Sequence, residues 1–346
     1  MQVTIIDDGF SYDGRTPNER PLGSAEKAVV GFSEALAERG HDVVVVNRIT
    51  EIVELNGVTW LPWDSPRPPS QDLVIALRKP SLLEEAEAEK CLLWLWGGCK
   101  ALDNTHNQAL LEKHRPALIY VSEAQRLGWR SWRIFPGQVI EPAIARVFLE
   151  QEADDEEPSP LAVTTTHPVH GLQAIIRMWT ENIRPKCPKA ELHVYSAVLA
   201  KAMETSEPDL KIAAVYEDIL VAANSGIQVK RPLPDPDMAT VYHRAKVHLY
   251  PVISSEVYCG TLAESQASGL PAVVNAADGQ AGAASLRVRN GQTGYLAPDE
   301  SAFVNLTCEI LSEGSSIYRT LHRDALALQR QRSWHVAAIE LETVWQ

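Results

Sequence analysis

The chain has 346 residues, of which 45% are hydrophobic, so it is long enough for about two domains, each with its own core. This composition excludes a short disulfide scaffold, a fibre and a disordered chain. With 32 lysines and arginines against 45 aspartates and glutamates, the net charge is −13, which opposes general binding to nucleic acid or anionic lipid. An anionic ligand would have to be held locally, by backbone amides and a few cations.

The first residues read as a strand and lack the charged and apolar regions of a signal peptide. No run of 18 apolar residues occurs, and the apolar stretch at 91–99 suits a buried strand that runs into a loop. The five cysteines are widely spaced without a C-x-x-C motif, which indicates neither a disulfide framework nor a zinc site. We therefore expect a cytoplasmic protein with no metal site and no cofactor.

The first half of the chain alternates short apolar runs with helical patterns, which is typical of an open, mostly parallel α/β sheet. A helix is predicted at 25–39, closed by Gly40. The predicted strands of this half are 3–6, 43–46, 73–77, 91–96 and 118–121.

An acidic, proline-bearing stretch at 150–160 has the composition of an exposed linker. After it the α/β pattern returns, with strands predicted at 162–165, 192–195, 247–250 and 272–275, and helices at 171–182, 235–244, 261–268, 301–311 and 333–344. We expect two doubly wound, Rossmann-like domains, 1–152 and 153–332, facing across a cleft, with a C-terminal helix at 333–346 that packs back on the first. Ligands of such sheets bind at the carboxyl ends of the strands.

The most informative local pattern is residues 254–274, where a loop carries Glu256 and a helix opening at Gly260 and Thr261 carries Glu264. The free amides of a helix N-terminus could hold a diphosphate, and Glu264 could accept hydrogen bonds from a ribose diol. Thr261-x-x-Glu264 also fits a capping box, and Glu256 could be an ordinary solvated carboxylate. The spacing alone leaves both interpretations open.

This stretch resembles the Glu-x7-Glu signature of retaining glycosyltransferases of the GT-B fold, glycosyltransferase family 4, with Glu256 and Glu264 at the two signature glutamates. The resemblance covers nearly the whole chain. It includes the small-residue turn of Ala267, Gly269 and Pro271, the Gly-Gln-Thr-Gly at 291–294, and the N-terminal segments 21–26 and 38–43.

The resemblance implies a metal-independent, retaining transfer of a hexose from a UDP- or GDP-linked donor to a sugar, glycolipid or small-molecule acceptor. The second domain would hold the donor, with its diphosphate at Thr261, its ribose at Glu264 and its sugar near Glu256. Gly23 and Ser24 would close over the phosphates or the acceptor. The implied donor-binding residues are Gly23, Ser24, Thr166, Tyr258, Cys259, Gly260, Thr261, Leu262 and Glu264, and the implied catalytic residues are Glu256 and His170.

The sequence departs from the family pattern after the first strand of the second domain. Where an Arg and a Lys are common, residues 164–172 read TTTHPVHGL. His170 could be protonated beside a diphosphate, could donate while neutral, or could simply begin a helix. A second hypothesis is therefore a catalytically silent GT-B protein that binds a nucleotide sugar or a protein partner.

Several other features carry less weight. Asp7–Gly9 could bind an acceptor hydroxyl, although a turn is favoured. Residues 126–133 interleave three arginines with two tryptophans, which suits a membrane interface or sugar stacking, although most such stretches are surface helices whose tryptophans point inward. Peripheral membrane contact is the most that we expect. A glycoside hydrolase is disfavoured because the two glutamates straddle a helix start, and a nicotinamide dehydrogenase because Gly-x-Gly-x-x-Gly is absent.

Overall fold

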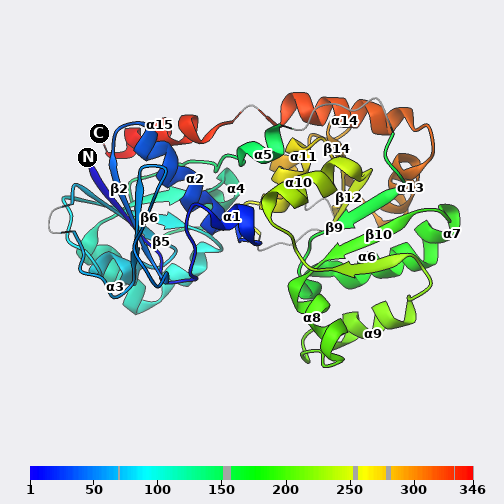
Figure 1. Cartoon of the computed structure of the whole chain (residues 1–346), viewed down its shortest axis with the longest axis horizontal. Coiled ribbons are helices and arrows are strands. Elements are labelled where there is room, and N and C mark those ends of the chain that lie inside the picture. Colours follow the sequence, from blue (N-terminus) through cyan, green and yellow to red (C-terminus); the bar gives the residue numbers. More distant parts are fainter. Residues whose placement is uncertain (69–70, 151–156, 252–255, 278–281, 331, 346) are drawn as a thin grey trace. The chain divides into compact units, whose positions relative to one another are not determined.

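The computed structural model describes residues 1–68, 71–150, 157–251, 256–277, 282–330 and 332–345. The chain forms two compact units (Figure 1). Unit 1 comprises Met1–Ala145, Ser255–Tyr258 and Arg332–Gln346, and unit 2 comprises Arg146–Ser254 and Cys259–Gln331. The first change of unit comes after Ala145, earlier than the boundary expected at 152. The short segment at 256–258 belongs to unit 1 although both flanking stretches belong to unit 2.

Unit 1 is built on an eight-stranded sheet with the strand order β3-β4-β2-β1-β5-β6-β7-β8, in which only β3 is antiparallel to its neighbour. The strands are β1 Gln2–Ile6, β2 Asp42–Asn47, β3 Val53–Leu55, β4 Val58–Pro62, β5 Leu73–Leu77, β6 Lys90–Leu95, β7 Ala117–Tyr120 and β8 Gly137–Val139. The helices are α1 Thr16–Glu19, α2 Ser24–Glu38, α3 Thr105–His114, α4 Glu123–Leu127 and α15 Trp334–Trp345, with 3-10 turns at Pro80–Glu84 and Cys99–Asp103. The predicted parallel sheet is confirmed.

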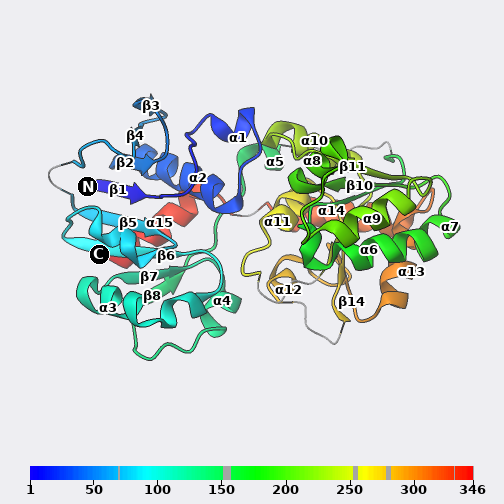
Figure 2. The same cartoon turned by 90° about the horizontal axis from the view of Figure 1, so that it is seen from below.

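Both faces of this sheet are buried, as its continuous apolar strands require. One face packs against α2 through side chains such as Val29, Phe32 and Leu36, and the other against Leu82, Leu102 and Leu111. Helix α15 lies along α2 (Figure 2). Gly31 allows this close approach, because a Cβ there would come within 2.3 Å of the Trp334 ring.

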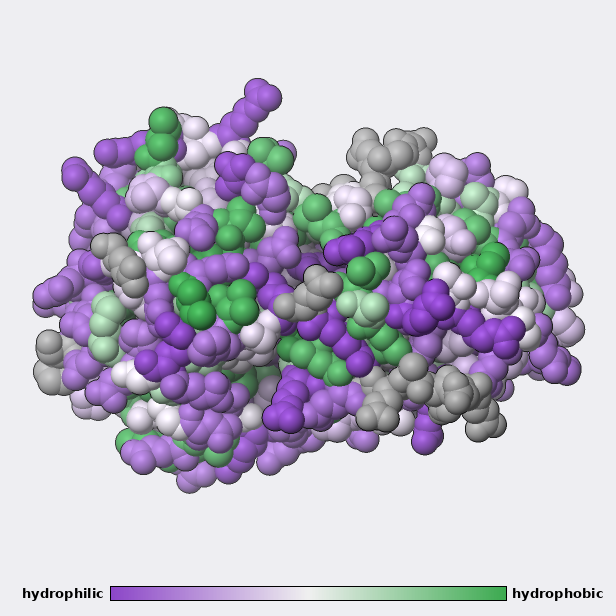
Figure 3. All heavy atoms as spheres, turned by 90° about the horizontal axis from the view of Figure 1, so that it is seen from above, coloured by the Kyte–Doolittle hydropathy of each residue, from purple (hydrophilic) through white to green (hydrophobic). Residues whose placement is uncertain are grey.

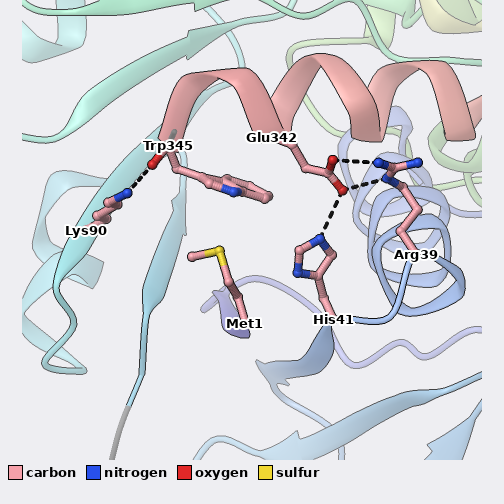
Figure 4. Close-up of a pocket in the computed structure, with 6 residues that line it drawn as sticks. All are labelled: Met1, Arg39, His41, Lys90, Glu342 and Trp345. Atoms are coloured by element: carbon pink, nitrogen blue, oxygen red, sulfur yellow. Dashed lines mark hydrogen bonds and ion pairs between the residues drawn. The ribbon is translucent and has the colours of Figure 1, made fainter.

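Ionic contacts anchor the end of α15 at the amino edge of the sheet. The Arg39 guanidinium donates to both carboxylate oxygens of Glu342, at 2.5 and 2.6 Å, and His41 Nε2 lies 3.0 Å from the same carboxylate. Lys90 donates to the carbonyl of Trp345. Figure 4 shows these side chains around a cavity of about 380 Å³. The hydrogen bonds from Arg39, with those from His41, lower the pKa of Glu342 to about 2.

Unit 2 is built on a six-stranded parallel sheet with the order β11-β10-β9-β12-β13-β14, the doubly wound order of Rossmann folds. The strands are β9 Leu161–Thr164, β10 Glu191–Tyr195, β11 Ile227–Lys230, β12 Val247–Pro251, β13 Ala272–Asn275 and β14 Gly294–Ala297. The helices are α5 Arg146–Leu149, α6 Gln173–Met178, α7 Arg184–Lys186, α8 Ala197–Thr205, α9 Ala213–Val221, α10 Asp235–Arg244, α11 Gly260–Ala267, α12 Ala284–Arg287, α13 Glu300–Leu311 and α14 Ser316–Leu328, with π turns at Pro168–Leu172 and Trp179–Ile183.

One prediction for unit 2 is wrong. The helix expected to begin at Gly171 begins at Gln173, because Gly171 has a φ of +83°, outside the helical region. Helix α14, whose N-cap Ser315 accepts from the Tyr318 amide at 3.1 Å, was not predicted.

The surface face drawn in Figure 3 is mainly hydrophilic, with hydrophobic side chains scattered among polar ones. Among the described residues, no helix is both long and apolar enough to cross a bilayer.

Candidate functional site

The topology of unit 2 marks one place on its sheet as the candidate site. The chain leaves β9 toward β10 on one side, whereas β12 lies on the other side of β9. Ligands of doubly wound sheets bind outside the carboxyl ends of the strands at such a switch point. Residues 165–172 follow β9 there, and α11 comes after β12, so the structure brings together two of the sequence stretches singled out above.

A chain of hydrogen-bonded side chains joins these two stretches. Thr165 Oγ1 lies 2.8 Å from Thr261 Oγ1 on α11 and 3.2 Å from His248 Nε2 on β12. His248 Nδ1 lies 2.8 Å from the hydroxyl of Ser265, one turn further along α11. Burial lowers the pKa of His248 to about 3, so its imidazole stays neutral at physiological pH. This network fixes the start of α11 against the end of β9.

Helix α11 begins at Gly260, as predicted, and the side chain of its N-cap residue makes no capping hydrogen bond. Its N-cap, Cys259, is 1% exposed and has a φ of +57°, a left-handed conformation that is uncommon outside glycine. The first bond within the helix runs from the Ala263 amide to the Cys259 carbonyl, at 3.0 Å. Thr261 therefore lies inside the helix, and the capping-box interpretation is wrong. Three amides, those of Gly260, Thr261 and Leu262, precede this first bond.

Glu264 lies one turn into α11 and is 8% exposed. Its negative charge, with that of Asp235, adds to burial in raising the pKa of Tyr242. A nearly buried carboxylate one turn beyond a helix N-terminus can accept hydrogen bonds from a diol while the preceding amides donate to an anion.

The turn after β9 holds the other predicted residues of unit 2. Thr166 is 4% exposed, and its hydroxyl has no hydrogen-bond partner among the described residues. His170 is exposed, with its ring 5.4 Å from that of His167, and burial together with the charge of His170 lowers the pKa of His167. Gly171 fits closely over Pro251 at the end of β12, where a Cβ would come within 2.8 Å of the proline Cβ.

Glu256 and Tyr258 belong to unit 1, in the short segment that interrupts unit 2. Ser122 donates to the Val257 carbonyl at 2.5 Å, and the Tyr258 hydroxyl donates to the Pro142 carbonyl at 3.0 Å. The ring of Tyr258 also packs on Trp96, with centroids 5.5 Å apart. Because the hydroxyl of Tyr258 is already hydrogen-bonded to Pro142, a contact from Tyr258 to a bound nucleotide sugar would come from its backbone. Glu256 is half-buried.

Gly23 and Ser24, also in unit 1, are the N-cap and first residue of α2. The nearby carboxyl edge of β1 and β5 holds a buried ionic cluster that the sequence analysis missed. Arg78 donates to Glu26 and lies 3.6 Å from Asp7, which accepts from Tyr12 at 2.9 Å. Burial raises the pKa of Asp7, and the positive charge of Arg78 acts in the opposite direction. Asp7 also accepts from the Gly9 amide at 3.0 Å, which confirms the turn favoured there.

Within the described parts of the chain, no three His, Cys, Asp or Glu side chains are grouped so that they could hold a metal ion. The switch point of unit 2 instead contains amide and hydroxyl hydrogen-bond donors, followed one turn along α11 by the buried carboxylate of Glu264. Such donors bind anions without a protein cation.

Several solved structures are similar to this chain over nearly its whole length. Sucrose-phosphate synthase from Thermosynechococcus elongatus is similar over 100% of this chain and 98% of its own, with 14% identity and a TM-score of 0.73. WaaG, a glycosyltransferase of lipopolysaccharide biosynthesis, is similar over 99% of each chain, with 12% identity and a TM-score of 0.69. HepE from Anabaena, solved with UDP and glucose, is similar over 99% of this chain and 98% of its own, with 13% identity and a TM-score of 0.68.

At these identities the likenesses establish the fold, which is GT-B. Residues 158–313, which include the whole switch point of unit 2, match the family described as glycosyl transferases group 1. The chain thus has the GT-B fold, and its residues 158–313 resemble glycosyl transferases group 1, as the sequence resemblance implied. No curated protein sequence matches it significantly.

Proposed function

We propose that the protein is a retaining, metal-independent hexosyltransferase of the cytoplasm, which moves a sugar from a UDP- or GDP-linked donor to a sugar, glycolipid or small-molecule acceptor. The observation that carries the proposal is the start of α11, where three amides that precede the first helical hydrogen bond and the buried Glu264 lie at the switch point of the sheet. The Glu-x7-Glu resemblance and the UDP bound to HepE support a nucleotide-sugar donor.

In this proposal the donor diphosphate accepts hydrogen bonds from the amides of Gly260, Thr261 and Leu262. Thr166, whose hydroxyl has no partner within the described residues, supplies a further donor. The ribose hydroxyls donate to Glu264. The amide and hydroxyl groups assist departure of the nucleotide diphosphate, because preorganised dipoles stabilise the charge that develops on it without having to reorient.

Residues 164–172 contain no lysine or arginine, so this turn brings no fixed cation to the diphosphate. His167 and His170 are the titratable residues of the turn, and both are exposed. We assign His170 the role of a hydrogen-bond donor to the bound diphosphate, because an imidazole N–H can donate to an anion. The roles of Glu256 toward the donor sugar and of Gly23 and Ser24 toward the phosphates or acceptor remain predictions from the resemblance.

Calorimetric titration with UDP and GDP, followed by a transfer assay with the matching nucleotide hexoses, tests this proposal. Glu264→Gln is expected to weaken nucleotide binding roughly tenfold or more, since a hydrogen bond to a charged acceptor contributes about 1.5 kcal/mol or more. Glu256→Gln should leave UDP or GDP binding nearly unchanged and lower turnover of the sugar donor. Glu217→Gln, on the exposed side of α9, is the matched control.

Nuclear magnetic resonance of the product decides whether the anomeric configuration is retained. Unchanged donor turnover in Glu264→Gln would show that the site is assigned wrongly. Nucleotide binding without transfer or hydrolysis across the donor panel would support the catalytically silent alternative.

A further inference from the structure

The chain between α4 and β8 exposes large apolar side chains at the surface of unit 1. Residues 126–135, here called the arginine–tryptophan segment, run from the last two residues of α4 toward β8 at the edge of the unit (Figure 2). Leu127 is 68% exposed, Trp132 39% and Ile134 95%. The segment is not the surface helix with inward tryptophans favoured by the sequence analysis. Only Trp129 points inward.

Aromatic packing gives this segment a fixed shape. Trp129 is 8% exposed and its indole N–H donates to Asp103 at 3.0 Å, so it anchors the segment to the body of unit 1. The ring of Trp132 packs edge-on against Trp129 and Phe135, with centroids 6.1 and 5.4 Å apart. Ile134 is thus held outward next to a packed aromatic side chain, and its exposure is a property of an ordered surface.

The charge of the segment is opposite to that of the whole protein. No aspartate or glutamate occurs between Glu123 and Glu141, whereas Arg126, Arg130 and Arg133 fall inside that interval. Arg126 pairs with Glu123. Neither Arg130 nor Arg133 forms an ion pair within the described part of the chain. A cationic, apolar surface of this kind in a protein of net charge −13 is a local feature that the average charge conceals.

We propose that the arginine–tryptophan segment docks unit 1 on a membrane surface that contains anionic lipids. Trp132 would lie at the headgroup level with Ile134 and Leu127 entering the acyl boundary, and Arg130 and Arg133 would pair with the anionic headgroups. Charge complementarity favours this occupant over a second copy of the chain, because a symmetric contact would bring the same arginines face to face. The exposed aliphatic side chains favour it over a nucleic acid, to which they offer no stacking surface.

Co-sedimentation of the full chain with vesicles tests this proposal independently of the transfer reaction. One set contains phosphatidylglycerol mixed with phosphatidylcholine, and the other contains phosphatidylcholine alone. The wild type should bind the anionic vesicles and lose this binding as ionic strength rises. Replacing Arg130 and Arg133 together by Gln should weaken partition roughly 30-fold, at about fivefold for each cation near the surface.

Ile134→Ser should also weaken binding to anionic vesicles, because it removes an apolar side chain from the acyl boundary. Its matched control is Leu210→Ser in unit 2, where the side chain is 94% exposed. Arg146→Gln, at a side chain that is 89% exposed, is the control for the arginines. Circular dichroism of each variant establishes that it is folded.

Any one of the following outcomes would overturn the proposal. They are equal binding to both kinds of vesicle, unchanged binding of the arginine double variant or of Ile134→Ser, and concentration-dependent self-association that Ile134→Ser abolishes without vesicles. Binding to a single-stranded oligonucleotide with loss in the same variants would equally contradict it.

Discussion

Replacing Glu342 by Gln should loosen α15 from α2, because Glu342 accepts both hydrogen bonds of the Arg39 guanidinium and a contact from His41. The pKa of Glu342 is lowered from 4.5 to about 2, which corresponds to about 3 kcal/mol of stability at neutral pH, at about 1.4 kcal/mol per pH unit. The side chains of Glu342 and Arg39 are 13% and 24% exposed. Screening by water reduces the effect, and we expect about 1.5 to 3 kcal/mol.

Hydrogen exchange of the α15 amides, followed by mass spectrometry, measures this loss directly. Glu342→Gln should speed their exchange about 10- to 100-fold at pH 7, since about 1.4 kcal/mol is a factor of ten. Glu313→Gln, at a side chain that is 95% exposed and 3.9 Å from Lys189, is the control and should change nothing in α15.

The sign of the pH dependence follows from the lowered pKa of Glu342. The stabilisation is fully present above pH 4.5 and is lost as the pH falls toward 2, so at pH 3 the difference between variant and wild type should be about two fifths of its value at pH 7. A variant that exchanges within a factor of about two of wild type at pH 7 would refute the assignment of this ion pair as the anchor of α15.

Two further predictions concern unit 2. Gly171→Ala should destabilise unit 2 by about 1 to 2 kcal/mol in urea unfolding, because the φ of residue 171 is +83° and the new Cβ meets Pro251. The variant should also lower sugar transfer, because it moves His170. Unchanged stability and unchanged activity would contradict this prediction. Because burial lowers the pKa of His248 to about 3, the free energy of unfolding of the wild type should fall by up to about 1.4 kcal/mol per pH unit as the pH falls from 6.5 toward 3. His248→Gln should be less stable at pH 7 but should lack this slope, and a parallel pH dependence of the two proteins would show that His248 is not buried in neutral form.

The central strands of the two sheets were predictable because they are largely buried and therefore continuous in apolar character. Val43–Val46 is one such run and lies within β2. The hairpin of β3 and β4 also carried a signal that the analysis passed over. Asn56 and Gly57, with φ of +52° and +77°, form the two-residue turn that Asn-Gly favours between short strands.

The candidate site was predictable only in part, because its contacts join residues far apart in sequence. Thr165 and Thr261 are 96 residues apart, and Thr165 and His248 are 83 apart. His248 had no ligand spacing to mark it, and its role in the network depends on β12 lying beside β9. The one local clue was a histidine within a strand whose five residues are all buried.

The assignment of residues 256–258 to unit 1 could not be predicted for the same reason. It rests on contacts such as that between Ser122 and the Val257 carbonyl, 135 residues apart. The Glu-x7-Glu spacing places Glu256 and Glu264 close in sequence, and nothing in that spacing indicates that the first glutamate packs with the N-terminal half of the chain.

A crystal structure of the protein with UDP or GDP, whichever it binds more tightly, tests the central claim most directly. The account predicts diphosphate oxygens within hydrogen-bond distance of the amides of Gly260–Leu262, with the ribose hydroxyls on Glu264. A nucleotide bound elsewhere, or a ribose that does not reach Glu264, would contradict it.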